Sequence, residues 1–287
     1  WHIPHFEKML YDNAQLVSLY SKAYLKEKND LYKSTVVETL NFIKEELTAS
    51  NGAFYSSLDA DSKNNLGENE EGAFYGWKEA ELKQLLKNDF SLFKDFYNIN
   101  DFGFWEKDTY VLIRTQSKVD FAAANKITLI ALENKIANWK STLNSARNKR
   151  IKPNLDDKIL TSWNALMIQG YVDAYKALGD KEYLEIALKN ANFLIDHQLR
   201  KDNGLNRNFK NGLSTINGYS EDYGTVIQSF ISLYEVTLDE KWLATSKSLI
   251  DVLFVNFFDE RNQMFYFTSK EDESLIARKY EVSDGVI

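Results

Sequence analysis

Four short segments of the chain combine acidic and aromatic side chains in a pattern that an apolar core does not require. In chain order these segments contain His2, His5, Glu7, Tyr11 and Asp12, then Asp59 and Asp61, then Asp156, Asp157, Trp163 and Asn164, then Glu221, Asp222 and Tyr223. Aromatic rings stack on the apolar faces of sugar rings, and carboxylates accept hydrogen bonds from sugar hydroxyls. If the segments converge in the fold, they predict a saccharide site.

Two carboxylic groups of this set could perform glycoside hydrolysis, in which one acid protonates the leaving oxygen and a second carboxylate activates water. We predict Asp157 and Asp222 as that pair, with Glu221 as a further catalytic candidate, and the other residues of the four segments as substrate-binding. An epimerase would instead place two acid/base groups, usually histidines, on opposite faces of the sugar. Only His2 and His5 are available for that chemistry, and both come from one loop. The residues therefore favour a hydrolase over an epimerase.

A non-catalytic alternative accounts for the same residues. The acids of the third and fourth segments occur where predicted helices begin, and acidic side chains at that position stabilise a helix by about 0.5 to 2 kcal/mol. Trp163 and Tyr223 lie on helical faces, where aromatic residues more often belong to the core. The alternative is a binding or scaffold module whose carboxylates are used by helix caps and by pairs with Arg or Lys.

An internal repeat indicates the architecture that must position these residues. In three stretches an aromatic residue precedes a second landmark by 22 residues, in the pairs Tyr32 and Phe54, Tyr183 and Leu205, and Trp242 and Met264. Each interval carries apolar residues at helical spacing, which predicts a helix. A fixed frame of this kind indicates one repeated structural unit, a helical hairpin.

The predicted fold is all-α, an α/α toroid of helical hairpins resembling an (α/α)6 barrel. Helices are predicted near 32–48, 78–97 (a short pair), 126–148, 158–178, 181–199, 221–237 and 240–257. Two Gly-Ala-Phe-Tyr copies, at 52–55 and 72–75, predict a short β-hairpin at one mouth. Six hairpins at the 59-residue step from Tyr183 to Trp242 need roughly 350 residues, so we expect residues 1–287 to form one incomplete toroid domain. Inner helices of a toroid begin around one rim, where the polar segments would meet.

Composition excludes several classes of function. A net charge of −7 and a pI near 5.2 argue against nucleic-acid binding, and the basic cluster at 147–152 fits the cationic end of a predicted helix. The chain has no cysteine, which excludes disulfides, thiolate catalysis and cysteine-ligated zinc and leaves the compartment open, with the cytoplasm slightly favoured. His2 and His5 lack the spacing of a helical metal site, so we expect no metal and no cofactor. No apolar run is long enough to predict a membrane span.

Taken together, the motifs at 1–12, 59–62, 156–164 and 221–223 resemble the thioredoxin-domain proteins typified by spermatogenesis-associated protein 20. The resemblance spans essentially the whole chain. It implies an architecture similar to six-hairpin glycosidases and N-acylglucosamine 2-epimerases, with a thioredoxin-like domain upstream as partner and with C-terminal hairpins that follow the segment 280–287. Ala165 departs from the pattern, because the family usually has Gly there. The resemblance implies no settled reaction.

Overall fold

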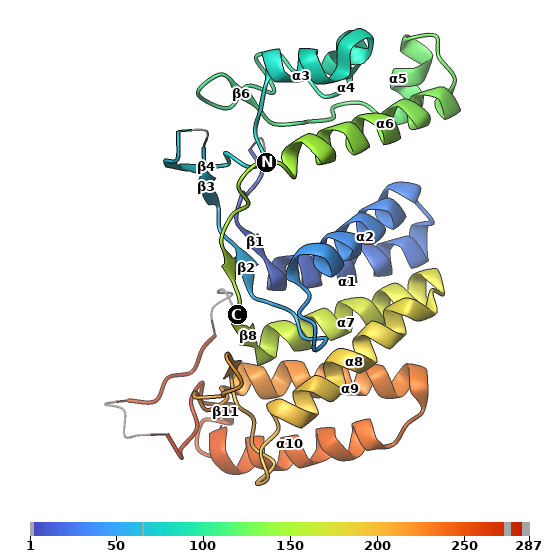
Figure 1. Cartoon of the computed structure of the whole chain (residues 1–287). Helices are drawn as coiled ribbons and strands as arrows, with labels where there is room; N and C mark the ends of the chain where they lie inside the picture. Colours follow the sequence, from blue (N-terminus) through green and yellow to red (C-terminus); the bar gives the residue numbers. More distant parts are fainter. Residues whose placement is uncertain (1–2, 65, 273–276, 283–287) are drawn as a thin grey trace. The chain divides into compact units, whose positions relative to one another are not determined.

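The computed structural model describes residues 3–64, 66–272 and 277–282 (Figure 1). Backbone contacts divide the chain into two compact units: unit 1 contains Trp1–Glu7 and Asp59–Asn154, and unit 2 contains Lys8–Leu58 and Leu155–Ile287. Each unit has its own apolar core. His2 and the last part of the segment 280–287, from 283 to 287, lie outside the described residues. The organisation as one toroid domain with an upstream thioredoxin-like domain stays a prediction.

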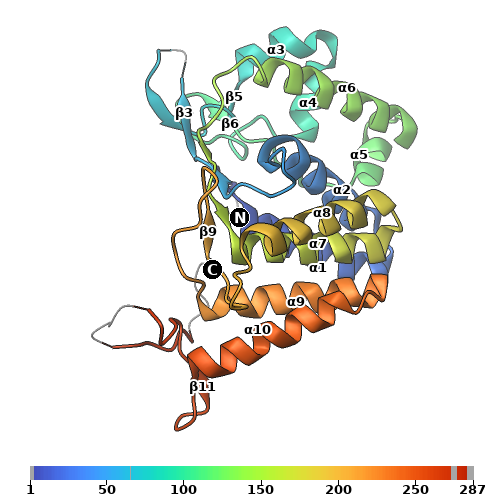
Figure 2. The same ribbon diagram turned by 60° about the horizontal axis from the view of Figure 1, so that its bottom comes forward.

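Unit 2 is built from three helical hairpins. Their helices are α1 (Leu10–Glu27) with α2 (Asp30–Phe42), α7 (Thr161–Leu178) with α8 (Lys181–His197), and α9 (Ser220–Thr237) with α10 (Lys241–Phe257). A π-helical turn, Ile43–Leu47, extends α2. Helix α7 packs between α1 and α9 (Figure 1), and Figure 2 shows α9 and α10 side by side. The hairpins predicted after residue 158 and after residue 221 are therefore confirmed.

Pro4 and Pro153 each precede a long apolar helical pattern, which would predict that a helix begins at the proline, but neither helix of the structure begins there. Helix α1 starts at Leu10, and the strand β1 (Lys8–Met9) separates it from Pro4. Two strands likewise lie between Pro153 and α7. Because the residue before each of these helices is extended and pairs in a sheet, strand pairing sets where the helix begins.

The repeat frame corresponds to one recurring structure. Each aromatic landmark lies in the first turn of the second helix of a hairpin, at Tyr32, Tyr183 and Trp242. Each second landmark forms an antiparallel β pairing with a residue a few positions earlier, in the pairs Thr48 and Phe54, Leu199 and Leu205, and Asp259 and Met264. Every hairpin of unit 2 thus ends in the same tight reversal, which confirms the predicted repeated unit.

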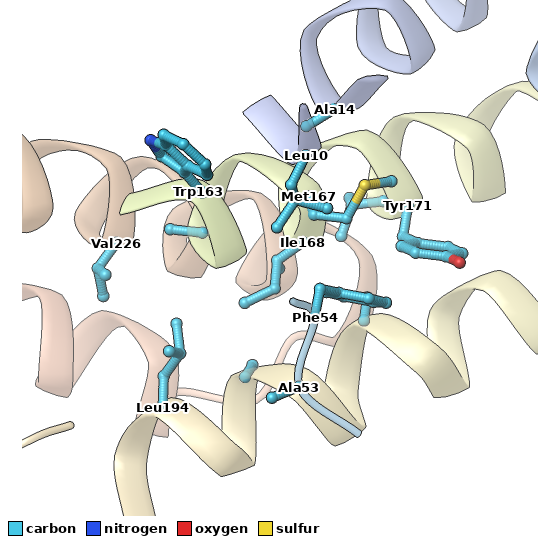
Figure 3. Close-up of a cluster of buried hydrophobic side chains, with 14 of the residues drawn as sticks. Leu10, Ala14, Ala53, Phe54, Trp163, Met167, Ile168, Tyr171, Leu194 and Val226 are labelled. Carbon is cyan, nitrogen blue, oxygen red and sulfur yellow. The ribbon is translucent and has the colours of Figure 1, made fainter. Parts of the chain in front are cut away.

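Helix α7 forms the centre of the unit 2 core. All of its residues from 161 to 174 are buried except Leu166, and side chains such as Met167 and Ile168 pack with Leu10 of α1 (Figure 3). A Cβ atom at Gly170 would lie 3.0 Å from the Ala14 carbonyl oxygen of α1. The missing side chain at Gly170 therefore allows the two helices to approach closely.

Short antiparallel sheets place the beginnings of α1 and α7 next to each other. Strand β2 (Ser57–Leu58) pairs with β1 on one side and with β7 (Leu155–Asp156) on the other. Strand β8 (Ile159–Leu160) continues directly into α7 and pairs with β9 (Asn208–Phe209). The strands come from distant parts of the sequence, so they bring the polar segments of unit 2 together.

Unit 1 combines helices with two pairs of short antiparallel strands. Its elements are β3 (Asp61–Lys63) with β4 (Asn69–Glu71), β5 (Trp77–Lys78) with β6 (Thr109–Tyr110), α3 (Glu79–Leu86), a 3-10 turn (Lys87–Asp89), α4 (Phe90–Phe96), α5 (Lys118–Ala124) and α6 (Leu129–Arg147). The helix predicted at 126–148 and the pair at 78–97 are confirmed, whereas α5 was not predicted. The β-hairpin forms between the two Gly-Ala-Phe-Tyr copies, from 61 to 71, and residues 72–75 form a turn instead of a strand. Gly72, at φ +69°, favours the turn.

Candidate functional site

The first turns of α1, α7 and α9 lie on the same side of unit 2 (left in Figure 1). We call these turns, together with Asp156, Asp157 and the loop residues Arg207 and Lys210, the rim of unit 2. Contacts across the rim join the third and fourth polar segments to each other and join Tyr11 of the first segment to the third. The first turns of three helices from distant parts of the sequence thus meet in unit 2.

Tyr11 and Trp163 form the aromatic part of the rim. Their ring centroids are 4.9 Å apart and the rings are tilted by 58°. Trp163 is 7% exposed and belongs to the core of the unit (Figure 3), whereas Tyr11 is half-buried. Tyr11 thus presents the accessible ring, with Trp163 packed against it.

Asp222 is the buried acid of the rim. Its side chain has no exposed surface, and its Oδ1 accepts a hydrogen bond from the Ser162 backbone N–H at 3.0 Å. Its Oδ2 accepts from the Tyr219 N–H at 2.8 Å and from Arg207 Nη1 at 3.2 Å. Burial raises the pKa of Asp222 to about 6, against the opposing effect of Arg207. Asp222 closes a capping box for α9 and joins this helix to α7.

Glu221 contacts Arg207, the cation that also contacts Asp222. Arg207 Nη1 lies 2.5 Å from Glu221 Oε1, and the guanidinium stacks 4.5 Å from the centroid of the Tyr219 ring. Glu221 and Asp222 are consecutive residues of one helical turn bound to one nitrogen atom. They therefore approach a ligand from the same side, which does not suit two acids that flank a glycosidic bond.

Asp156 and Asp157 are each paired with a lysine. Lys210 Nζ lies 2.5 Å from Asp157 Oδ1, and the hydrogen bond from Lys210 lowers the pKa of Asp157. Lys158 Nζ lies 3.0 Å from Asp156 Oδ2. The Asp157 side chain is 46% exposed and remains open to solvent. These two carboxylates are hydrogen-bond acceptors held in place by lysines.

Sequence reasoning missed Arg207 and Lys210. Both lie in the loop between α8 and α9, on either side of β9. The signal available in the sequence was a pair of cations three positions apart in a loop that lies before an acidic helix start. Their pairing with the rim acids follows from the β8–β9 register, which the sequence did not reveal.

Asn164 has a fully buried amide that holds backbone groups of another segment. Its Oδ1 accepts from the Phe54 N–H at 2.8 Å and from Asn190 Nδ2 at 2.9 Å, and its Nδ2 donates to the Phe54 carbonyl at 3.0 Å and to Leu160 at 2.9 Å. All of these partners are protein groups. The structure thus gives Asn164 a role in joining α7 to the reversal after α2.

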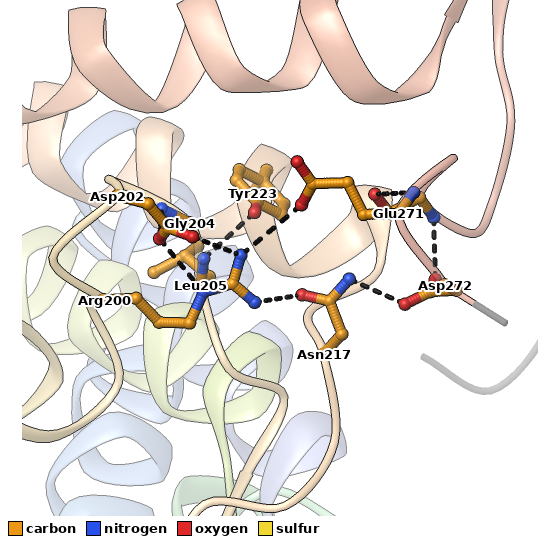
Figure 4. A network of polar contacts seen from close by, with 9 residues as sticks. Arg200, Asp202, Gly204, Leu205, Asn217, Tyr223, Glu271 and Asp272 are labelled. Atoms are coloured by element: carbon orange, nitrogen blue, oxygen red, sulfur yellow. Dashed lines mark hydrogen bonds and ion pairs between the residues drawn. The ribbon is translucent and has the colours of Figure 1, made fainter.

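Tyr223 makes a comparable link between α9 and the reversal after α8. Its hydroxyl oxygen accepts the Leu205 N–H at 3.0 Å (Figure 4). In the same region Arg200 binds Asp202 and Asn217. The Tyr223 ring is 1% exposed, and burial raises the pKa of its hydroxyl.

The remaining predicted site residues are one residue of the rim and four residues of unit 1. Asp12 is an exposed residue in the first turn of α1 in unit 2. The other four belong to unit 1, namely His5, Glu7, Asp59 and Asp61. His5 is exposed, with its Nδ1 3.4 Å from the Glu7 carbonyl oxygen. Within the described residues no three such side chains cluster as metal ligands would, and no helix has the length and apolar character needed to cross a membrane.

Similarity to known proteins places the chain in a family. The family model described as beta-L-arabinofuranosidase, GH127 catalytic domain, matches residues 94–278. Uncharacterized protein B0495.5 of Caenorhabditis elegans is 31% identical over 312 residues, covering 99% of this chain and 42% of that protein. Spermatogenesis-associated protein 20 of Homo sapiens is 30% identical over 300 residues, covering 94% of this chain and 38% of that protein. The chain thus spans about two fifths of the length of these relatives.

A solved structure supports the fold. The cellobiose 2-epimerase of Spirochaeta thermophila superimposes with a TM-score of 0.52 at 12% identity, covering 89% of this chain and 45% of that one. The predicted α/α toroid fold class and the predicted resemblance are both confirmed. The chain has a glycosidase-like α/α fold and belongs to the beta-L-arabinofuranosidase GH127 catalytic domain family.

Proposed function

We propose that the rim of unit 2 binds a saccharide. Family membership supports a carbohydrate ligand, and the rim supplies the groups that recognise one. Tyr11 offers an aromatic ring, Asp157 and Glu221 offer partly exposed acceptors, and Lys210 and Arg207 offer donors. These residue types match both the apolar faces and the hydroxyl edges of a sugar.

The pairing of the rim carboxylates with cations is the observation that carries this proposal. Asp156, Asp157, Glu221 and Asp222 all contact Lys or Arg. A carboxylate that contacts a cation is held in place as an acceptor, which suits hydrogen bonding to hydroxyls. A general acid needs a proton near working pH, and the lysine beside Asp157 works against protonation of that group. Binding is therefore better supported than hydrolysis by Asp157 with Asp222.

The binding test uses thermal unfolding of the chain with methyl β-L-arabinofuranoside, a monosaccharide panel and N-acylated amino sugars. A sugar present at 100 times its dissociation constant should stabilise the fold by about 2.7 kcal/mol, a rise in melting temperature of roughly 5 °C. Asp157→Asn and Glu221→Gln should each weaken the effect, because each removes an acceptor charge. Glu182→Gln is the matched control, since Glu182 forms a comparable exposed pair with Lys44 at the other end of the α7–α8 hairpin. Absence of a sugar-dependent shift in the unmodified chain, with cooperative unfolding, would favour a scaffold role.

Hydrolysis remains a second candidate because of one observation. Burial raises the pKa of Asp222 to about 6, within the range of a general acid. With its present burial, Asp222 could act only after an opening of the rim that exposed the carboxyl group to substrate. Release of 4-nitrophenol from a 4-nitrophenyl arabinofuranoside that is lost in Asp222→Asn, while sugar binding persists, would support this candidate. Equal release by both proteins would exclude Asp222 as the acid.

A further inference from the structure

Unit 1 contains a cavity that none of the predicted site residues line. The cavity has a volume of about 90 Å³. Its walls come from β5, α4, the segment after β6, and α6, through Trp77, Phe93, Tyr97, Leu112, Trp139, Lys140, Leu143, Asn144 and Arg147. All of these residues belong to unit 1, so the cavity does not depend on the rim of unit 2.

Rigid aromatic rings form the apolar part of the wall. Trp77, Phe93 and Trp139 are 4%, 0% and 2% exposed. The Phe93 and Trp139 rings meet edge to face at 5.4 Å, and Trp139 Nε1 donates to Asp89 Oδ2 at 3.1 Å. Asp89 does not line the cavity. Because this bond satisfies the N–H of Trp139 away from the cavity, the ring contributes apolar surface to the wall. The walls are held by these contacts and do not need a ligand to form.

One side of the cavity is cationic. Lys140, Asn144 and Arg147 lie at helical spacing along α6, so they occupy one stripe of the helix. Arg147 Nη2 donates to Asn144 Oδ1 at 3.1 Å, and its guanidinium lies 5.4 Å from the centroid of the Phe74 ring. The Arg147 Nε atom is buried and has no hydrogen-bond partner in the part of the chain that the structure describes. A buried guanidinium N–H without an acceptor is costly, and a bound anion would supply the acceptor.

The residues that line the cavity favour some classes of ligand over others. This lining set contains two cations and no Asp or Glu, so it does not suit a cationic ligand. Sugar sites use carboxylates to accept hydroxyl hydrogen bonds, and the lining set has none. The aromatic walls favour an apolar body over a fully hydrated inorganic anion. An apolar cavity of about 150 Å³ in another protein holds benzene, so about 90 Å³ fits roughly four heavy atoms, which matches the carbon atoms of a short carboxylate whose two oxygens lie against Arg147 at the cationic side.

We propose that this cavity binds a small organic carboxylate of about four carbons, with its chain against Trp77 and Trp139 and its carboxylate on Arg147. The proposal adds a ligand site in unit 1 and is independent of saccharide binding at the rim. The carboxylate would accept hydrogen bonds from the guanidinium, while the alkyl chain would replace water against the aromatic walls.

Sodium butyrate is the probe, titrated at constant ionic strength into the full chain labelled with 15N at tryptophan. The indole N–H signals of Trp77 and Trp139, assigned through Trp→Phe variants, report on the cavity directly. We expect saturable shifts of both signals with butyrate and at least about tenfold weaker binding of butyramide, which has the same shape without the charge. Equal binding of butyrate and butyramide, or saturation by phosphate or a monosaccharide instead, would overturn the proposal.

Two variants separate charge from cavity shape. Arg147→Gln should weaken butyrate binding at least about tenfold, whereas Lys149→Gln, an exposed neighbour outside the lining set, should not change it. Leu143→Phe retains Arg147 but reduces the cavity, and it should also abolish binding. If Arg147→Gln fails to fold, the Leu143→Phe titration decides the question. Unchanged affinity in a folded Leu143→Phe protein contradicts the proposal.

Discussion

The Asp222 carboxylate of α9 accepts the backbone N–H of Ser162 at 3.0 Å and so ties the first turn of α9 to the first turn of α7. The bond connects two hairpins, and the same carboxylate caps its own helix through the Tyr219 N–H. Asp222 therefore stabilises the rim as well as contributing charge to it. The burial of Asp222 predicts how the stability of the protein depends on pH.

Asp222→Asn should be less stable than the unmodified chain at pH 4.5, with the difference shrinking toward pH 7.5. The pKa of Asp222 is raised from 3.8 to about 6 by burial. A raised carboxyl pKa contributes stability that is present below the unfolded-state pKa and is lost as pH rises through the folded-state value. The unmodified chain should thus lose about 2 kcal/mol from this group between pH 4.5 and 7.5, and asparagine cannot titrate. Urea unfolding at a series of pH values measures the difference.

Asp157→Asn is the control for this pH dependence. Lys210 lowers the pKa of Asp157, so its contribution is lost only as pH falls below the usual aspartate range. The stability difference for this variant should stay flat from pH 4.5 to 7.5. A gap for Asp222→Asn that widens with rising pH would show that Arg207, and not burial, dominates the ionisation of Asp222.

Asn164→Leu should destabilise unit 2 by about 3 kcal/mol, because it leaves buried Phe54 backbone groups without partners. Asn192→Ala is the matched control: Asn192 is an exposed residue of α8, two positions from Asn190. Chemical denaturation monitored by circular dichroism measures both variants. A loss below about 1 kcal/mol for Asn164→Leu would mean that water molecules or a shift of the backbone satisfy the Phe54 groups. Asn164 would then not be needed to join α7 to the reversal after α2.

The hairpins could be predicted from sequence because their signals are local. Apolar residues such as Leu184, Leu188 and Ala191 recur at helical spacing within one helix, and the tight reversals follow at a fixed offset. The partners of the site residues could not be predicted in the same way. Asn164 bonds to Phe54 across 110 positions, and no short pattern in the sequence encodes that pairing. Aromatic and acidic composition therefore indicated the rim, but not which of its side chains are occupied by structural bonds.

Two helical glycines should respond to alanine in opposite directions. At Gly170 of α7 the new Cβ would lie 3.0 Å from the Ala14 carbonyl, so Gly170→Ala should destabilise by about 1 kcal/mol despite the better helix propensity of alanine. At Gly224 of α9 nothing lies within 4 Å of that position, so Gly224→Ala should stabilise by about 0.5 to 1 kcal/mol. Thermal unfolding of the pair measures both signs. Stabilisation by both changes would show that α1 can move away from α7 at little cost.

Arg150→Lys should destabilise unit 1 by about 2 kcal/mol, because lysine cannot reproduce a planar guanidinium that makes several bonds at once. Arg150 Nη2 contacts both carboxylate oxygens of Glu81, at 3.0 and 2.9 Å, and its guanidinium stacks 4.1 Å from the centroid of the Trp77 ring. Its Nη1 donates to the carbonyl oxygens of Ala73, Phe74 and Gly76. The sequence interpretation of this residue as part of a cationic helix end misses these bonds, since α6 ends at Arg147 and Arg150 holds the 72–77 turn.

Lys149→Arg is the control for Arg150→Lys, because it makes the reverse exchange at an exposed neighbouring position. We expect no change in stability for it. Urea unfolding followed by the 15N indole signal of Trp77 reports on unit 1 specifically, since Trp77 packs in the core of that unit. Equal midpoints for Arg150→Lys and the unmodified chain would show that one charge at this position is sufficient and that the carbonyl bonds contribute little, because the ammonium of lysine retains the charge while losing the fork of donors.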